Sequence, residues 1–290
     1  MKRMLRAGLR RMKNWLAEEP SVPEEEPLVP FDNKYKWLGS AFRHIYNADP
    51  ACRHHPYLWG VLEGVALAKV LGYPRVSVIE FGVAGGHGLL ALERIAAHVE
   101  KMVGILIDVH GFDTGVGLPA PTDYRDVPYM WDKGYFPMDK DKLTKRLQRA
   151  ELKLGLVERT VPEFLRSPFA PVAFISFDLD LYTGTQHALR LLEASSDRLL
   201  PRVSCYFDDI MGYGYNDCTG ERLAIAEFNA QHSMRKLSLH YGLKWFVPSQ
   251  NQNDRWVEMM YLAHIFEHPL YGACAFLNRV SVKDIEGNSR

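Results

Sequence analysis

Two apolar runs in the second half of the chain each end in acidic residues. The runs are 172–177 and 202–207, and the acids are Asp178, Asp180, Asp208 and Asp209. Apolar runs of this length are typical of strands buried on both faces of a parallel sheet. Ligands gather at the carboxyl ends of such strands, so we expect Asp178, Asp208 and Asp209 to form one cluster.

A cluster of three carboxylates predicts a bound cation. Ionised carboxylates repel one another at short range unless a positive charge neutralises them. Carboxylate oxygens are hard ligands that suit Mg²⁺ or Mn²⁺, so Asp178, Asp208 and Asp209 are candidate metal ligands. The alternative is that Asp209 caps the following helix and that Asp180 faces solvent.

A general base is expected beside this cluster. Asp178 is the first candidate, because it can contact both the metal ion and a hydroxyl group. Asp180 and His187, which lies on the helix predicted after Asp180, are the alternatives. A divalent ion lowers the pKa of a bound hydroxyl, so these residues indicate proton removal from an alcohol.

A glycine-rich loop forms the second candidate site. The predicted strand 75–81 contains Glu80, and glycines follow at 82, 85, 86 and 88 before a helical pattern begins. Glycines let a ligand approach the backbone closely, and a helix start offers free N–H groups. Gly82, Gly86 and Gly88 also fit a dinucleotide loop, but Glu80 better suits a ligand with a cationic amino-acid end. A glycine-rich turn without a ligand is the remaining alternative.

An acid also follows the next predicted strand, 103–112. In doubly wound folds an acid at the position of Asp113 accepts hydrogen bonds from ribose hydroxyls. The alternative is a turn-forming aspartate before Thr114. The segment 119–140 is predicted to be a long loop over the site. Its Tyr129 and Lys133 fit the Y-x-x-x-K pair of dehydrogenases, but they lie too close to the glycine loop for that family.

The pattern Glu80-x-Gly82-x-x-x-Gly86 resembles the first motif of class I S-adenosylmethionine (SAM) methyltransferases. Five further segments follow in order: GFDTGVGLP (111–119), VPEFL (161–165), FDLDLY (177–182), FDDI (207–210) and GERLAIAEF (220–228). Together they resemble the metal-dependent sugar O-methyltransferases of antibiotic pathways, the macrocin and novobiocin type. The resemblance implies SAM at Glu80, Gly82, Gly86 and Asp113, and Mg²⁺ or Mn²⁺ at the three aspartates. Leu179 departs from the glycine that this family tends to have.

The function implied is SAM-dependent O-methylation of a sugar or glycosylated small molecule. Two rival functions stay open. Asp178-Leu179-Asp180 is similar to the DxD motif of nucleotide-sugar glycosyltransferases, which also hold Mn²⁺ or Mg²⁺. A non-catalytic SAM-fold scaffold is the other rival.

The predicted fold is α/β, a doubly wound, Rossmann-like, mostly parallel sheet of seven strands. Residues 31–74 are expected to form a helical cap and 75–290 the methyltransferase domain. The last two strands are predicted over 236–243 and 256–266, the latter antiparallel and inserted. Residues 1–30 combine a basic amphipathic helix, suited to weak membrane or partner contact, with a linker of prolines and glutamates.

Composition points to a soluble, globular, cytoplasmic chain. The 290 residues carry no net charge, which gives no general attraction to nucleic acid. The four cysteines form no CxxC pair, and no apolar run is long enough to span a bilayer. We leave a homo-oligomer open. A metal site at Cys52, His54 and His55 is less favoured, because adjacent side chains point apart.

Overall fold

The computed structural model describes residues 34–273. The basic helix and the linker expected over 1–30 lie outside these residues, as does Cys274. Within the described range, no helix combines the length and the apolar character needed to cross a membrane.

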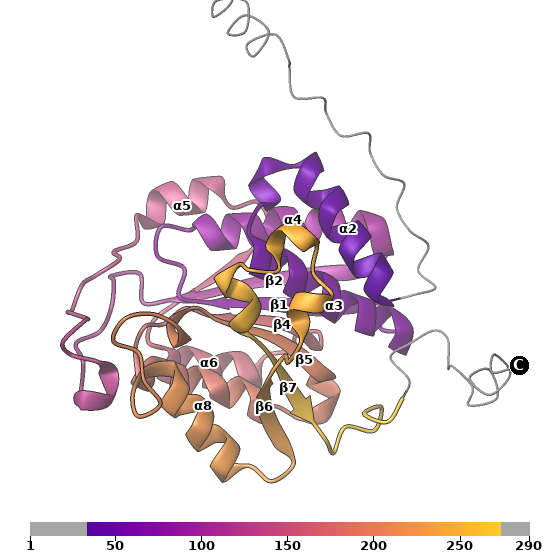
Figure 1. Cartoon of the computed structure of the whole chain (residues 1–290). Coiled ribbons are helices and arrows are strands. Elements are labelled where there is room, and N and C mark those ends of the chain that lie inside the picture. Colours follow the sequence, from indigo (N-terminus) through magenta and orange to yellow (C-terminus); the bar gives the residue numbers. More distant parts are fainter. Residues whose placement is uncertain (1–33, 274–290) are drawn as a thin grey trace, which may run out of the picture.

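A seven-stranded sheet runs through the centre of the molecule in the order β3-β2-β1-β4-β5-β7-β6 (Figure 1). Its strands are β1 Arg75–Phe81, β2 Leu106–Asp113, β3 Glu151–Leu154, β4 Val172–Phe177, β5 Leu199–Phe207, β6 Arg235–Leu239 and β7 Met260–Ile265. All neighbours from β3 to β5 pair in parallel, and β7 pairs antiparallel with both β5 and β6. This is the strand order of class I SAM-dependent methyltransferases, and it confirms the predicted fold and the inserted antiparallel strand.

Helices cover both faces of this sheet. In Figure 1, α2, α3, α4 and α5 lie on one side, and α6 and α8 lie on the other. The bounds are α2 Lys34–Ala48, α3 His55–Leu71, α4 His87–Val103, α5 Lys140–Arg146, α6 Val157–Arg166, α7 Tyr182–Leu189 and α8 Gly220–Gln231. Helix α7 packs against both α6 and α8. Because helices cover both faces of the sheet, the central strand β4 is buried along its whole length, which explains its continuous apolar sequence.

The segment expected as a cap supplies α2 and α3, and α3 packs directly on β4 and β5. Two glycines make this approach close. A Cβ at Gly60 would lie 2.2 Å from the ring of Phe174, and one at Gly64 would lie 2.4 Å from the carbonyl oxygen of Ala173. Helix α3 ends as predicted at Gly72, whose φ of 79° is left-handed.

Several predicted boundaries are wrong by a few residues. Val103 ends α4 instead of starting β2, because Gly104 adopts a left-handed φ of 75° and closes that helix. Strand β5 starts at Leu199, three residues before the apolar run expected over 202–207.

The chain changes direction across the sheet at β1, which has β2 on one side and β4 on the other. At such a switch point, helices on opposite faces leave a crevice beyond the carboxyl ends of the strands. Both candidate sites lie at this edge.

Candidate active site

The three predicted metal ligands converge at the ends of β4 and β5. Phe177 and Phe207 are register partners in these adjacent strands, so the residues after them leave the sheet side by side. One carboxylate oxygen from each of Asp178, Asp208 and Asp209 lies within 4.8 Å of the other two. This group can surround a single cation.

The protein orders two of these carboxylates by hydrogen bonds. The Tyr206 hydroxyl donates to Asp208 Oδ1 at 2.5 Å, and the Tyr215 hydroxyl donates to Asp209 Oδ1 at 2.6 Å. Burial, followed by the charges of Asp208 and Asp209, raises the pKa of Asp178 well above its ordinary value. Burial also raises the pKa of Asp209 to about 6. Without a cation, Asp178 therefore keeps its proton to a higher pH than an ordinary aspartate does.

Asp180 lies close behind the cluster. It is 7 % exposed, so the alternative that it faces solvent is wrong. Its N–H donates to Asp209 Oδ2 at 2.9 Å, and its backbone has a φ of 60°, which is uncommon for a residue other than glycine. Burial and the charge of Asp209 raise the pKa of Asp180 to about 8. Its side chain lines the cavity, so Asp180 remains a candidate base.

A fifth acid, Glu221 on α8, was not predicted. It is fully buried and accepts the N–H of Asp209 at 3.0 Å and the hydroxyl of Thr185 at 3.4 Å. Burial and the nearby Asp209 raise its pKa well above its ordinary value. Glu221 therefore fixes the backbone that carries Asp209. The only sequence signal was its place in the segment GERLAIAEF.

Glu80 lies beneath the glycine loop and is 2 % exposed. Its Oε1 accepts the Tyr57 hydroxyl at 2.6 Å, and Tyr57 in turn accepts the Ser176 hydroxyl at 2.9 Å. Its Oε2 is buried with no hydrogen-bond partner among the described residues. Burial raises the pKa of Glu80 to about 8, although the Tyr57 hydrogen bond acts in the opposite direction. Tyr57 comes from α3 and was missed, because nothing in the sequence links it to β1.

The three predicted glycines have different roles. Gly82 has a φ of 87°, and a Cβ there would lie 1.7 Å from the carbonyl oxygen of Asp178. A Cβ at Gly88 would lie 1.9 Å from Glu80 Oε1, and one at Gly86 would meet the side chain of Leu143. Only Gly82 lines the cavity, so Gly86 and Gly88 shape the loop from beneath.

Asp113 ends β2 and ties the glycine loop to it. Its Oδ2 accepts the N–H groups of Val83 and Ala84, both at 2.9 Å, and its Oδ1 accepts that of Gly115 at 2.6 Å. A carboxylate has about four lone-pair sites, so one on Oδ1 is left for a ligand hydroxyl. Asp113 lines the cavity as well.

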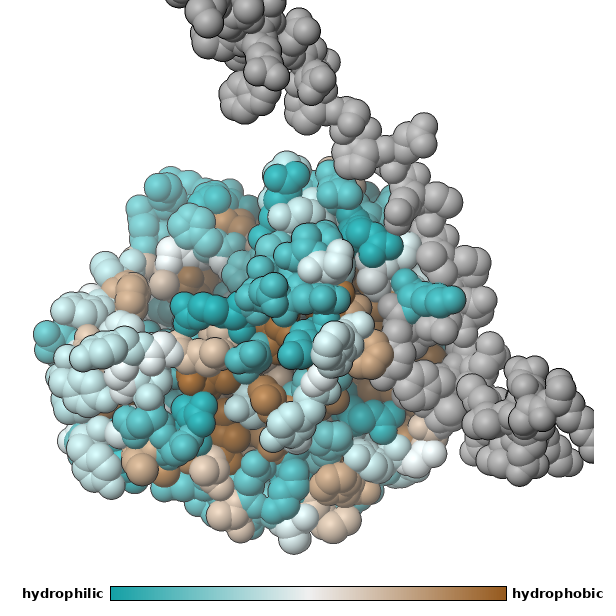
Figure 2. Space-filling view, in the orientation of Figure 1, coloured by the Kyte–Doolittle hydropathy of each residue, from teal (hydrophilic) through white to brown (hydrophobic). Residues whose placement is uncertain are grey.

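A cavity of about 550 Å³ joins these parts. Asp113 and residues 155–158 line one region of it, and Asp178, Asp180, Asp208, Asp209 and Tyr215 line another. Apolar side chains of the loop that follows β2 line it too, from Leu118, Pro119, Ala120, Trp131 and Phe136. We call residues 117–136 the roof loop. Figure 2 shows hydrophobic surface (brown) near the middle of the face turned to the viewer, with hydrophilic residues (teal) around it.

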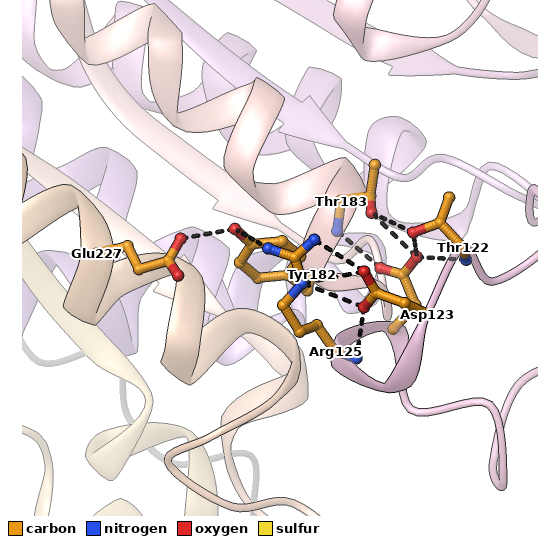
Figure 3. Close-up of polar contacts among 7 residues, drawn as sticks. Thr122, Asp123, Arg125, Tyr182, Thr183 and Glu227 are labelled. Carbon is orange, nitrogen blue, oxygen red and sulfur yellow. Dashed lines mark hydrogen bonds and ion pairs between the residues drawn. The ribbon is translucent and has the colours of Figure 1, made fainter.

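A clamp of polar contacts holds the roof loop on α7 and α8 (Figure 3). The guanidinium of Arg125 bonds both oxygens of Asp123 and lies 4.5 Å from the ring centre of Tyr182. The Tyr182 hydroxyl donates to Glu227 on α8 at 2.6 Å. Beside it, the fully buried Asp126 accepts the N–H and the hydroxyl of both Thr122 and Thr183. These contacts attach the first half of the roof loop to α7 and α8.

The remaining candidates are dispersed. His187 lines the cavity, with Nε2 3.9 Å from Glu158 Oε2. The Tyr129 hydroxyl donates to the Gly214 carbonyl at 2.7 Å on the outside of the roof loop, not into a catalytic pair.

Cys52, His54 and His55 do not come together. The Cys52 thiol lies beside Asp49 and His98, His55 faces Asp254, and His54 packs on the ring of Tyr57. Burial lowers the pKa of His54 to about 4.

Neither a protein-family model nor a curated protein sequence matches the chain. Solved structures do. The calicheamicin methyltransferase CalS11 is 24 % identical over 72 % of this chain and 88 % of its own, with a TM-score of 0.48. The O-methyltransferase NovP is 17 % identical over 61 % and 72 %, with a TM-score of 0.45. TomG of Streptomyces achromogenes, an O-methyltransferase involved in tomaymycin synthesis, is 15 % identical over 82 % and 92 %, with a TM-score of 0.39. Such identities do not transfer an activity, so the chemistry has to be inferred from the residues of the site.

Proposed function

We propose that this protein is a SAM-dependent O-methyltransferase that uses a divalent cation and acts on a hydroxyl of a sugar or a glycosylated small molecule. The observation that carries the proposal is the convergence of Asp178, Asp208 and Asp209 beside a glycine loop built on a buried glutamate. One part suits a methyl donor, and the other suits an activated hydroxyl.

The glycine loop fits SAM by the chemistry of its carboxylates. Glu80 presents one buried oxygen that has no hydrogen-bond partner within residues 34–273, as expected of an acid that receives a ligand ammonium group. Asp113 keeps one acceptor site for a ribose hydroxyl. Gly82 places bare backbone between these two acids and the aspartate cluster, because a side chain there would overlap Asp178.

The aspartate cluster fits Mg²⁺ or Mn²⁺. Its ligands are all carboxylate oxygens, the donor type that hard divalent ions prefer. Burial and mutual repulsion raise the pKa of Asp178, and a bound cation removes both penalties. A cation held there lowers the pKa of a coordinated hydroxyl, which is the chemistry that O-methylation requires.

The chain's own residues then orient the acceptor and take its proton. SAM held at the glycine loop would supply the methyl group; the acceptor oxygen would displace its sulfur, and the hydroxyl proton would pass to a carboxylate of the cavity. Asp178 and Asp180 both line the cavity, so either carboxylate is placed to receive that proton. His187 is the third candidate base, although its Nε2 faces Glu158.

The observations favour this function over its two rivals. A DxD site uses both acids of Asp178-Leu179-Asp180 at the cation, whereas here Asp178 groups with Asp208 and Asp209. A scaffold protein has no use for several buried acids, since burying them unpaired destabilises the fold.

Calorimetry and a methyl-transfer assay test the proposal together. SAM should bind with or without EDTA, and UDP-sugars should not bind. Labelled SAM with a panel of glycosides and Mg²⁺ should label oxygen, and EDTA should stop the transfer. Tight binding of a UDP-sugar without SAM binding would favour the glycosyltransferase instead.

A further inference from the structure

A second group of possible metal ligands lies outside the cavity described above. Asp49, Cys52 and His98 each offer one ligand atom, and these three atoms lie within 4.8 Å of one another. None of the three residues lines the cavity. Asp49 and Cys52 belong to the turn between α2 and α3, which contains the short helix η1 Pro50–Cys52, and His98 lies on α4. The group therefore joins this turn to α4, against which η1 packs.

The turn holds Asp49 in a fixed orientation. Its Oδ1 accepts the N–H of Ala51 at 2.9 Å, and its carbonyl oxygen accepts that of Cys52 at 2.9 Å. Pro50 fixes φ at the start of η1. These bonds leave Oδ2 of Asp49 available, and it lies 3.2 Å from His98 Nε2. One carboxylate oxygen and one imidazole nitrogen are thus already side by side.

The thiol of Cys52 completes the group. Cys52 is fully buried and forms no disulfide, and its Sγ has no hydrogen-bond partner among residues 34–273. A buried cysteine usually packs as a small apolar side chain. Here the sulfur also lies within 4.8 Å of a carboxylate oxygen and of an imidazole nitrogen. An unpartnered, buried thiol beside two other ligand atoms points to a bound ion.

This donor set differs from that of the aspartate cluster. A thiolate, an imidazole and a carboxylate are ligands of Zn²⁺, whereas Mg²⁺ prefers oxygen alone. Ligand atoms at roughly 2.0–2.3 Å from a tetrahedral zinc ion lie roughly 3–4 Å apart. The 3.2 Å between Asp49 Oδ2 and His98 Nε2 fits this spacing, and the sulfur has to approach by only about 1 Å. The His98 side chain is 34 % exposed, so water can take the fourth position.

Two features of the metal-free chain oppose binding, and neither blocks it. The Arg94 guanidinium lies 3.2 Å from Asp49 Oδ2, but the Arg94 side chain is 58 % exposed and can turn into solvent at little cost. Burial raises the pKa of the Cys52 thiol to about 12. A zinc ion displaces the proton of a thiol that it binds, so this cost lowers the affinity without preventing ligation. We therefore expect weaker binding than at a structural zinc site with four protein ligands.

We propose that Asp49, Cys52 and His98 form a zinc site that fastens the turn between α2 and α3 to α4. Helix α4 begins at the glycine loop, and α3 carries Tyr57, whose hydroxyl donates to Glu80. A zinc ion there braces, from outside the cavity, the two helices that support this loop. The proposal goes beyond methyl transfer and does not depend on it, because its ligands are not those of the proposed methyltransferase site.

Cobalt binding tests the site, because Co²⁺ accepts the same ligands as Zn²⁺ and its thiolate complexes absorb in the near ultraviolet. Co²⁺ is titrated into the full chain with excess Mg²⁺, which competes for the aspartate cluster. We expect one equivalent to produce a thiolate-to-cobalt charge-transfer band that Zn²⁺ removes. Cys52→Ser should abolish this band. Both Cys52→Ser and His98→Gln should weaken Co²⁺ binding at least about tenfold, as even the loss of an outer partner of a metal ligand does. Zn²⁺ should also raise the melting temperature of the wild type more than that of His98→Gln.

Two variants control for binding elsewhere on the chain. Cys218→Ser removes an exposed free cysteine, and His232→Gln removes a half-buried histidine at the end of α8. Both should leave the band and the Co²⁺ affinity unchanged. The absence of a thiolate band in the wild-type chain would overturn the proposal, as would a band that persists at full strength in Cys52→Ser. If Cys52→Ser does not fold, His98→Gln decides the question, because His98 lies partly at the surface: an unchanged Co²⁺ affinity of that variant would overturn the proposal.

Discussion

The glutamate under the glycine loop and the aspartates at the neighbouring strand ends are both buried acids, but they are built differently. Glu80 stands on one strand, has one tyrosine donor and leaves one oxygen free. Asp178, Asp208 and Asp209 come from two strands and face one another within 4.8 Å. A lone buried carboxylate can be satisfied by one positive charge with N–H donors, whereas three ionised carboxylates that face one another need more positive charge, which the proposed divalent ion would supply.

The two sites are also joined at one point. The carbonyl oxygen of Asp178 lies where a Gly82 side chain would be, so the end of β4 supports the start of the glycine loop. A molecule bound at the glycine loop would therefore lie next to a cation or hydroxyl group bound at the aspartate cluster. Variants that damage one site and spare the other test whether their roles are separate.

The largest effect is expected from the cluster. Asp208→Asn removes a charge from the proposed ligand set and should lower kcat/KM for methyl transfer by roughly 10³-fold, as the loss of one main electrostatic group does elsewhere. SAM affinity should stay within about twofold, because Glu80 and Asp113 remain in place. Turnover as a function of Mg²⁺ concentration and calorimetry with SAM measure the two effects.

Asp141→Asn is the matched control, because Asp141 is an exposed aspartate on α5. Full activity of Asp208→Asn in EDTA would reduce the cluster to a structural feature and leave a metal-free methyltransferase.

The next largest effect is expected at Glu80. Glu80→Gln keeps the size of the side chain and removes its charge, so SAM affinity should fall by about 10- to 100-fold, the range for a hydrogen bond to a charged group. Tyr57→Phe removes the donor and keeps the carboxylate, so its affinity should fall less. Equal SAM affinity for wild type and Glu80→Gln would show that the free oxygen serves another purpose. Mg²⁺ affinity should be unchanged in both variants.

The sequence predicted the parts of the molecule that depend on strand ends. Apolar runs identified β1, β4 and the core of β5, and parallel strands bring the residues that follow them to one edge. Asp178, Asp208 and Asp209 could therefore be grouped without coordinates. Gly82 and Asp113 were assigned in the same way.

The supporting residues could not be predicted, because they reach the site from elements distant in the chain. Tyr57 comes from α3 and Glu221 from α8, and each looks like an ordinary helix residue in the sequence. Helix ends were misplaced where one residue decides them, as at Gly104. The clamp around Arg125 joins a loop to two helices, and no periodic pattern encodes such a contact.

The free energy of unfolding, measured as a function of pH, tests whether the buried acids of the two sites hold protons in the folded chain. The folded pKa of Glu80 and of Asp180 is raised to about 8, so the folded, metal-free chain binds more protons than the unfolded chain above pH 5. Its free energy of unfolding should therefore fall as pH rises, by about 3 kcal/mol between pH 6.5 and 8 from Glu80 and Asp180 together. In this window His54 adds little, because its pKa is lowered to about 4 and unfolded histidine is mostly neutral.

Urea unfolding in EDTA measures how the free energy of unfolding changes with pH. Mg²⁺ should remove the contribution of Asp180 to this pH dependence and leave that of Glu80. Glu80→Gln should remove the contribution of Glu80 and leave that of Asp180. Metal-free stability that rises across the window would mean that these acids are already ionised.

The smallest effect is expected from the clamp around Arg125, which belongs to neither site but holds the roof loop on α7 and α8. Arg125 and Asp123 are both more than one-third exposed, so solvent screens their ion pair and the pair adds little to the stability of the fold. Arg125→Ala should therefore leave the melting temperature nearly unchanged and raise the acceptor KM by about three- to tenfold, because the apolar wall is held less firmly. Arg125→Lys keeps the charge but loses the bidentate geometry, so its acceptor KM should lie between the values for wild type and Arg125→Ala. Arg190→Ala, at an exposed arginine paired with Glu193, is the control. A larger change in SAM affinity than in acceptor KM would assign the roof loop to the cofactor instead of the acceptor.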